Sequence, residues 1–252
     1  MALSTMFDRD DTQVLWSGQC PALPQYRSSD HSRVRSHRSG ISRRRLVRPG
    51  DPARSSLKRV FDLIGAGTLL LFFAPLLIAI AIAIKTTSRG PVLFRQYRYG
   101  ASSRLFKIYK FRTMYTHLAD ASGVTQTQAG DQRVTRVGRL LRKTSLDELP
   151  QLFNVIRGDM SLVGPRPHVP GMLAAEFLYE DLIPYYFQRH SVRPGITGLA
   201  QVNGCRGSTG EAPAALARID HDLDYIETWS LRLDVAIILR TIKREFLSGS
   251  GV

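Results

Sequence analysis

Residues 63–84 read LIGAGTLLLFFAPLLIAIAIAI, and no side chain among them is charged. A helix that crosses a bilayer needs about 20 consecutive apolar residues. A soluble helix without a polar face would have nothing to present to water. The stretch therefore predicts one helix inside a membrane. The sequence contains a single segment of this kind, which excludes a channel or transporter built from a bundle of spans.

The residues around this stretch predict how the helix enters the membrane. Pro75 lies near the middle of it, and proline bends a helix because it removes a backbone donor and clashes with the preceding turn. Lys58 precedes the stretch, and Lys85 and Arg89 follow it, whereas a simple span carries its basic residues mainly on one side. We therefore expect residues 57–88 to form a re-entrant helix, with a straight span as the alternative.

The chain is also strongly basic. Its 252 residues contain 35 Lys and Arg against 21 Asp and Glu, a formal net charge of +14. Such a charge indicates anionic partners: nucleic acid, anionic lipid or phosphorylated substrates. Residues 1–56 are rich in Ser and Arg and interrupted by prolines, so we expect a disordered basic tail. This tail either attracts lipid headgroups or is simply solvated.

After the apolar stretch the pattern becomes that of a water-exposed domain. Residues 92–100 (VLFRQYRYG) and 102–114 (SSRLFKIYKFRTM) are rich in β-branched and aromatic residues on either side of a short turn. They predict a hairpin. Residues 116–131 are polar and contain glycine, and predict a mobile loop.

Three further segments predict helices. Residues 139–156 are helical in pattern with an interruption, residues 172–188 resemble an amphipathic helix, and residues 214–246 form another helical stretch. The apolar stripe at the end of the last one either packs on the core or lies in the membrane interface. We predict an α+β fold: one small catalytic domain, residues 89–252, with one N-terminal re-entrant membrane helix and peripheral amphipathic helices.

The richest chemistry lies in residues 142–167, RKTSLDELPQLFNVIRGDMSLVGPRP. Asp147 and Glu148 are adjacent, Ser145 before Glu148 fits a capping box, and Pro150 fits a first helical turn. Both cues place the carboxylates at a helix N-terminus, which favours the ionised form. An ionised carboxylate serves as a nucleophile or a Mg²⁺ ligand; the alternative is that the pair only stabilises the helix.

Basic residues accompany the acidic pair. Arginine and lysine clamp phosphoryl oxygens and shield the charge of a phosphoryl group in transfer. Prolines on both sides of Arg166 restrict its backbone, which suits a fixed fork for phosphate. Each cation taken singly could instead be an ordinary surface residue. The candidate phosphate-binding residues are Lys110, Arg112, Arg142, Arg166 and Arg193.

These residues belong to blocks by which the chain resembles the bacterial sugar transferase family, the monotopic phosphoglycosyl transferases. The matching blocks are KRVFDLIGAG, GPVLFRQYRYG, KIYKFRTM, DQRVTRVGRLLRKTSLDELPQLFNVIRGDMSLVGPRP, RPGITGLAQVNG and DLDYIETWSLRLDV. They occur in the family's order and cover roughly three quarters of the chain. The residues before Lys58 have no counterpart in the family's minimal domain.

The resemblance implies a reaction at the bacterial inner (cytoplasmic) membrane, with the catalytic domain facing the cytosol. A UDP-hexose, glucose or galactose, gives its sugar 1-phosphate to undecaprenyl phosphate and releases UMP, as the first membrane step of exopolysaccharide assembly. Asp147 matches the family's covalent nucleophile and Glu148 the residue associated with Mg²⁺. Arg142, Lys110 and Arg166 match basic site positions.

Asp222 matches a further acidic position of the family's site. One departure concerns the bend: many members have Ser-Pro where this chain has Ala74 and Pro75. Two other function classes compete. The first is a basic binding protein, but the sequence matches no nucleic-acid-binding motif, so we expect no nucleic-acid partner. The second is a catalytically inactive membrane scaffold for glycan enzymes. The oligomeric state stays open, a homo-oligomer included.

Overall fold

The structure is a computed structural model that describes residues 51–118, 130–207 and 210–248. The predicted basic tail and most of the predicted loop at residues 116–131 therefore lie outside the described residues. Within the described ranges the molecule mixes helices with three small two-stranded sheets. The α+β prediction is confirmed at this level.

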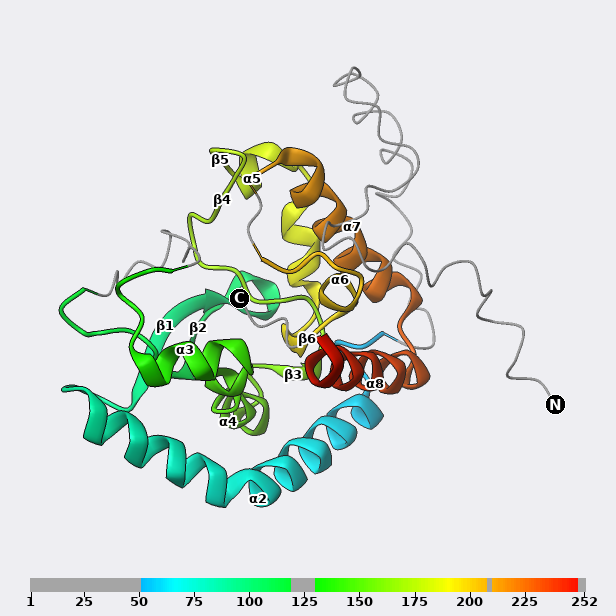
Figure 1. Ribbon diagram of the computed structural model, residues 1–252. Helices are drawn as coiled ribbons and strands as arrows, with labels where there is room; N and C mark the ends of the chain where they lie inside the picture. The colour runs from blue at the N-terminus through cyan, green and yellow to red at the C-terminus, as the bar shows by residue number, and fades with distance from the viewer. Residues whose placement is uncertain (1–50, 119–129, 208–209, 249–252) are drawn as a thin grey trace.

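The apolar stretch forms the long helix α2, Ser56–Thr87. Ser55 caps its start by accepting a hydrogen bond from the amide of Lys58. The helix continues through Pro75 and bends near its middle, beneath the rest of the domain (Figure 1). It is long and apolar enough to cross a membrane, and only 11% of its most apolar stretch is buried, with Leu71 80% exposed. That it returns to the leaflet it enters stays a prediction.

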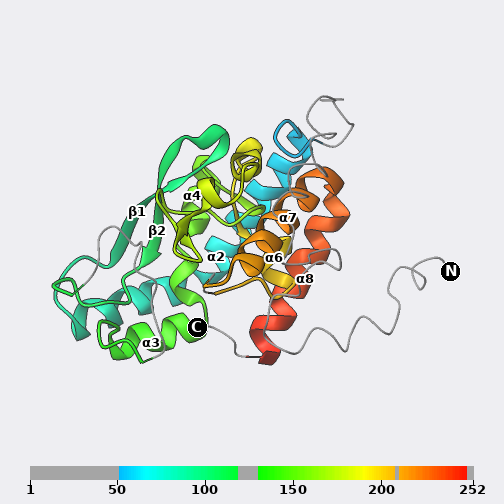
Figure 2. The ribbon, with the colours of Figure 1, turned by 90° about the horizontal axis from the view of Figure 1, so that it is seen from above.

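The predicted hairpin is confirmed. β1, Leu93–Tyr99, pairs antiparallel with β2, Leu105–Phe111, across the short 3-10 turn Ala101–Ser103. Seen from above, α2 passes from the side of the two C-terminal helices, α7 (Ala212–Thr228) and α8 (Leu231–Ser248), to the side of this hairpin (Figure 2). The hairpin thus stands over the C-terminal half of α2.

The interrupted helix at residues 139–156 is also confirmed. It consists of α3, Arg136–Lys143, the 3-10 turn η4, Leu146–Glu148, and α4, Gln151–Arg157. Two parallel strands lie beyond it, β3, Ser161–Val163, and β6, Gly195–Thr197.

The amphipathic helix expected at residues 172–188 is wrong. The segment forms a small hairpin, β4 Leu173–Ala174 and β5 Phe177–Leu178, then the short helix α5, Tyr179–Leu182, and the 3-10 helix η5, Tyr186–Ser191. Ala175 and Glu176 have positive φ in the hairpin turn, and Pro184 prevents a continuous helix. Two of the aromatic rings that suggested an apolar stripe, Tyr179 and Tyr186, instead pack on the buried His168.

The helical stretch at residues 214–246 is two helices. α6, Leu199–Val202, precedes them; α7 spans Ala212–Thr228 and α8 spans Leu231–Ser248. α8 packs on the core through Ile237, which is fully buried, while Leu239 on the same helix is 61% exposed.

The main core joins the membrane helix to the domain. Its buried members are Ala66, Ile108, Leu152, Val155, Met160, Leu162, Val163, Tyr225 and Ile237. Gly65 of α2 lies so close to β3 that a Cβ there would stand 2.6 Å from Leu162 Cδ1. A larger residue would therefore require the Leu162 side chain to move.

A buried charge cluster strengthens this junction. Lys58 Nζ lies 3.3 Å from Asp62 Oδ1 and 2.9 Å from Asp234 Oδ2. Asp62 also accepts hydrogen bonds from Ser161 Oγ at 2.7 Å and from the amide of Leu162 at 3.0 Å. We call Lys58, Asp62 and Asp234 the anchor cluster, because they tie α2 to β3 and α8.

Candidate active site

The candidate site centres on the carboxylate of Glu148, at the end of the turn η4. Lys110 Nζ, from β2, donates to Glu148 Oε1 at 2.9 Å. Arg166, which follows β3, donates from Nη2 to Oε1 at 2.5 Å and from Nη1 to Oε2 at 3.1 Å. This two-point geometry is the strong form of an arginine–carboxylate contact. We call Lys110, Glu148 and Arg166 the Glu148 cluster.

The local backbone explains how the turn presents these groups. The predicted capping box is wrong, because Ser145 adopts a left-handed conformation with φ of 55° and its side chain caps nothing. Its hydroxyl instead accepts a hydrogen bond from Arg206 Nη2 at 2.7 Å. Pro150 is the N-cap of α4, so Asp147 and Glu148 lie in a separate turn just before that helix.

The pKa values of the two carboxyls shift in opposite directions. Burial raises the pKa of Asp147 to about 6, although Lys110 and then Arg142 oppose the shift. Burial also acts to raise the pKa of Glu148, but Arg166 and Lys110 outweigh it and hold that pKa well below the usual range. The expected preference for the ionised form therefore holds for Glu148, whereas for Asp147 burial opposes ionisation and outweighs the neighbouring cations.

A buried ion pair, Arg189 with Asp222, holds the backbone of Arg166. Arg189 donates to Asp222 Oδ2 from Nε at 2.9 Å and from Nη2 at 2.6 Å, and both side chains are at most 2% exposed. The same Nη2 donates to the carbonyl oxygen of Arg166 at 2.6 Å. Asp222 thus reaches the Glu148 cluster through Arg189 and the Arg166 backbone. Close backbone packing adds to this, since a Cβ on Gly164 would stand 2.7 Å from the carbonyl of residue 193.

The structure brings some of the predicted residues together and separates others. Lys110, Arg166 and the two carboxylates meet, and Arg142 lies near enough to affect Asp147. Two candidates lie elsewhere.

Arg112 donates to the carbonyls of Ser88, at 2.9 Å, and Arg89, at the end of α2. Arg193 Nε donates to the carbonyl of Gly158 at 3.0 Å, at the end of α4. Basic side chains commonly satisfy the last carbonyls of helices, and sequence spacing does not separate that use from phosphate binding.

Two arginines near the site were not among the predicted residues. Arg98 of β1 donates to the carbonyl of Pro167 at 3.3 Å, and burial together with Arg166 lowers its pKa to about 10. Arg206 holds Ser145 and lines a cavity beside Glu148. Arg98 lies in the predicted hairpin, far from Arg166 in the sequence, so nothing in the sequence indicated that the two arginines lie close together.

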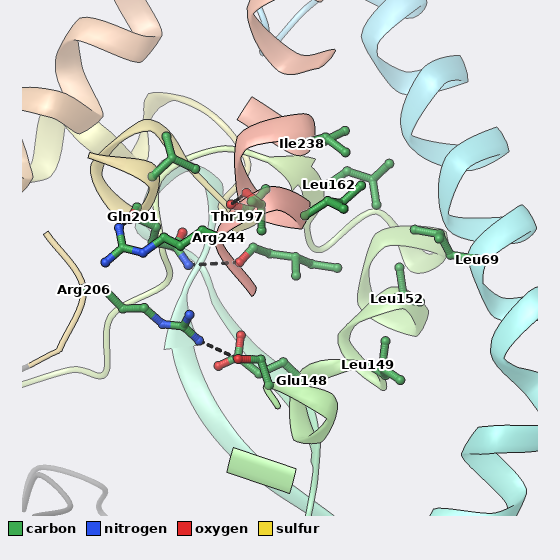
Figure 3. A pocket seen from close by; sticks show the side chains of 15 residues that line it. Leu69, Glu148, Leu149, Leu152, Leu162, Thr197, Gln201, Arg206, Ile238 and Arg244 are labelled. Atoms are coloured by element: carbon green, nitrogen blue, oxygen red, sulfur yellow. Dashed lines mark hydrogen bonds between the residues drawn. The ribbon is translucent and has the colours of Figure 1, made fainter. Parts of the chain in front are cut away.

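A cavity of about 210 Å³ opens next to Glu148. Aliphatic side chains from α2, α4, β3 and α8 line one part of it, among them Leu69, Leu152 and Ile238. Figure 3 shows these residues on the side of α2, with Arg206, Gln201 and Arg244 on the opposite side. The site therefore joins a charged cluster to an apolar space against the membrane helix.

Comparison of the sequence with known proteins identifies one family. Residues 53–248 match the model of the family described as bacterial sugar transferase. The chain is 51% identical over 195 residues to an exopolysaccharide production protein of Rhizobium leguminosarum bv. phaseoli, a match that covers 77% of this chain and 98% of that one.

Two further relatives carry an activity in their names. The chain is 52% identical to a UDP-glucose:undecaprenyl-phosphate glucose-1-phosphate transferase of Caulobacter vibrioides, over 78% of this chain and 73% of the relative. It is 53% identical to an undecaprenyl-phosphate glucose phosphotransferase of Komagataeibacter xylinus, over 76% of this chain, which spans only 36% of that relative. By the match over most of its length, the chain belongs to the bacterial sugar transferase family.

Proposed function

We propose that the protein transfers hexose 1-phosphate from a UDP-hexose to undecaprenyl phosphate and releases UMP, as the first membrane step of exopolysaccharide assembly. The observation that carries the proposal is the Glu148 cluster beside the buried carboxyl of Asp147, at an apolar cavity next to α2. The names of the relatives favour glucose, and galactose is the other donor we retain.

In the first step an Asp147 carboxylate oxygen attacks the phosphorus that carries the sugar. A bond forms between that oxygen and the phosphorus, and the bond from the phosphorus to the bridging oxygen breaks. UMP leaves with the electron pair. Asp147 must be ionised to attack, and a pKa of about 6 leaves it mainly ionised at pH 7. Lys110 and Arg142 favour that anion.

In the second step an oxygen of undecaprenyl phosphate attacks the same phosphorus. The bond to Asp147 breaks, the carboxylate is restored, and the sugar leaves as undecaprenyl diphosphate hexose. Because UMP departs before the lipid reacts, the two substrates use the site in turn. Ping-pong kinetics are the expected consequence.

The fixed cations account for the binding of phosphoryl oxygens. Arg166 is held from both sides, by Glu148 through its guanidinium and by Arg189 through its carbonyl. A donor preorganised in this way stabilises developing charge without moving during the reaction. Lys110 and Arg98 add positive charge on the same side.

The donor set also fits Mg²⁺ of the kind found in phosphoryl-transfer sites. Among the described residues no group of three His, Cys, Asp or Glu could hold a metal by itself, but Mg²⁺ typically uses one or two carboxylates and completes its shell with phosphates and water. Glu148 and the adjacent Asp147 supply two carboxylates, and Glu148 Oε2 accepts one hydrogen bond, from Arg166. Bound there, Mg²⁺ would neutralise charge on the diphosphate.

The membrane helix explains how a water-soluble donor meets a lipid acceptor. α2 packs against α4 and β3, the elements that flank the Glu148 cluster. A helix held in the cytosolic leaflet of the inner membrane would place the cluster at the height of lipid phosphates. We propose this cytosol-facing, re-entrant placement together with the reaction.

The experiment is UMP release by the full-length protein in nanodiscs, with Mg²⁺, undecaprenyl phosphate and a panel of UDP-glucose, UDP-galactose and their N-acetylated forms. We expect release that depends on the lipid, is fastest with a non-acetylated hexose, and falls about a thousandfold or more in Asp147→Asn.

Asp181→Asn, at the exposed position of the short helix α5, is the matched control and should keep full activity. Undiminished release by Asp147→Asn would refute the covalent role of this residue. Absence of lipid-dependent release with every UDP-sugar, from folded membrane-bound protein, would refute the reaction and leave the scaffold hypothesis.

A further inference from the structure

The cavity beside Glu148 has two chemically different sides. Toward α2 its walls are aliphatic, and Figure 3 shows Leu69, Leu149, Leu152 and Ile238 there. On the other side lie the guanidinium groups of Arg206 and Arg244 with Gln201, as the figure also shows. A cavity that separates apolar from cationic surface in this way complements an amphiphile with an anionic head.

The cationic side is held in place by defined contacts. Arg206 Nη2 donates to Ser145 Oγ at 2.7 Å, and Arg244 Nη1 donates to the carbonyl of Gln201 at 2.8 Å. Ser145 directly precedes the turn that carries Asp147 and Glu148. An anionic group beside Arg206 would therefore stand next to the reacting carboxylates.

The aliphatic walls do not suit the nucleoside of the donor. None of the lining residues that the structure describes is aromatic, so this part of the cavity offers a base no ring to stack on. Branched aliphatic side chains instead match a branched hydrocarbon. At about 210 Å³ the cavity is also smaller than typical small-molecule sites of roughly 300–1,000 Å³, so it accommodates only the part of a long chain next to its head.

One wall belongs to the membrane helix itself. Leu69 lies on α2 and is 37% exposed, and Leu71 on the same helix is 80% exposed without lining the cavity. A hydrocarbon chain that leaves the cavity past Leu69 would therefore enter the bilayer directly. The remainder of a long lipid needs no further protein site.

We propose that this cavity is the acceptor subsite: the isoprene units next to the phosphate lie on Leu69, Leu152 and Ile238, and the phosphate lies against Arg206, at the end of the cavity next to the turn that carries Asp147 and Glu148. The assignment rests on the proposed function and deepens it, because it separates the lipid's place from that of the UDP-sugar at Lys110 and Arg166. A bulky side chain in the apolar part should hinder the lipid and spare the donor.

The test compares Leu69→Trp with Leu71→Trp, and Ile238→Trp with Leu239→Trp, in nanodiscs. The first variant of each pair fills the cavity, and the second adds the same ring to an exposed position of the same helix. We expect kcat/KM for undecaprenyl phosphate to fall about tenfold or more in the cavity variants only. The kcat/KM for the UDP-sugar should stay within about twofold of the parent.

A fall confined to the UDP-sugar would overturn the proposal and assign the cavity to the donor. Unchanged kinetics in Leu69→Trp and Ile238→Trp, or an equal fall in the control variants, would also overturn it. Direct binding keeps the inference testable if the proposed reaction itself fails. Native mass spectrometry with undecaprenyl phosphate should then show lipid retained by the parent and Leu71→Trp and lost from Leu69→Trp; equal retention would refute the subsite.

Discussion

The anchor cluster and the Glu148 cluster are both groups of paired charges, but they differ in how exposed their side chains are to solvent and ligands. The anchor cluster joins one lysine to two carboxylates, and the Glu148 cluster joins a lysine and an arginine to one carboxylate; each links elements far apart in the chain. In the anchor cluster the side chains of Lys58, Asp62 and Asp234 are 4%, 1% and 0% exposed. In the Glu148 cluster Lys110, Glu148 and Arg166 are 18%, 12% and 32% exposed.

The surroundings of the two clusters differ in the same sense. Asp234 also accepts hydrogen bonds from the Tyr225 hydroxyl at 2.9 Å and from Trp229 Nε1 at 3.1 Å. Its carboxylate oxygens are therefore bound by other protein groups. Glu148 instead lines a cavity. An ion pair therefore indicates a reaction site only when a ligand can reach it, because structural ion pairs perturb pKa values just as strongly.

The largest expected effect is on stability, in the closed cluster. Lys58→Met removes the cation shared by Asp62 and Asp234 and leaves two buried carboxylates without their counter-charge. Losing one partner of a buried ion pair costs about 3–5 kcal/mol. Chemical denaturation in detergent should show this loss, whereas Lys85→Met, at the exposed end of α2, should unfold as the parent does. A parent-like Lys58→Met would contradict the anchoring role.

The second effect concerns turnover, in the open cluster. Glu148→Gln removes the negative charge that holds Lys110 and Arg166, so both cations lose their fixed orientation toward the diphosphate. Loss of such a preorganised charge should lower kcat about 10²–10³-fold. The melting temperature should change far less than in Lys58→Met. Glu227→Gln on α7 is the exposed control, and a Glu148→Gln enzyme of normal kcat would remove this residue from the mechanism.

A smaller effect should appear in the pH dependence of stability. Burial and then Arg189 lower the pKa of His190 to about 3, and burial lowers the pKa of His168 well below its usual value. In the unfolded chain these histidines have a pKa near 6.5 and bind protons below that pH. In the folded state the same rings stay neutral until a much lower pH. The folded state is therefore fully favoured above about pH 6.5 and loses up to about 1.4 kcal/mol per histidine for each pH unit below it.

Thermal unfolding at pH 7.5 and 5.5 checks this sign. His190→Gln removes the titrating ring, so its melting temperature should fall less between the two pH values than that of the parent. His117→Gln, at an exposed position, should follow the parent. An equal pH dependence in the parent and His190→Gln would show that the buried imidazole contributes nothing.

The smallest effect is expected at an exposed ion pair. Arg157 Nε lies 3.6 Å from Asp159 Oδ2, with side chains 61% and 30% exposed. Solvent screens such pairs, which contribute about 0.2–1 kcal/mol. Asp159→Asn should therefore leave both turnover and the unfolding midpoint close to the parent. If Asp159→Asn lost as much free energy of unfolding as Lys58→Met, burial would not determine how much each ion pair contributes to stability.

Local patterns were enough to predict several elements. The uncharged stretch at residues 63–84 predicted α2 because a lack of polar positions is visible without any tertiary information. The hairpin and the interrupted helix around residue 146 followed from alternation and turn residues. The resemblance identified Asp147 and Glu148 because their block is continuous in sequence.

Local patterns failed where distant residues decide the outcome. Residues 172–188 have a helical apolar pattern, yet Tyr179 and Tyr186 pack on His168, and Pro184 interrupts the backbone. Arg112 and Arg193 are as basic as Lys110 and Arg166, but the packing directs them to helix ends.

The sequence by itself determined that a single apolar helix precedes a mixed α+β domain with an acidic pair among basic residues. Only the tertiary structure decided which cations meet Glu148, that Asp147 is buried enough to raise its pKa, and that an apolar cavity opens beside them. The reason is physical. Helix and strand patterns arise within a few residues of sequence. Ion pairing, desolvation and cavity shape depend instead on which segments, tens of residues apart in the sequence, pack together in space.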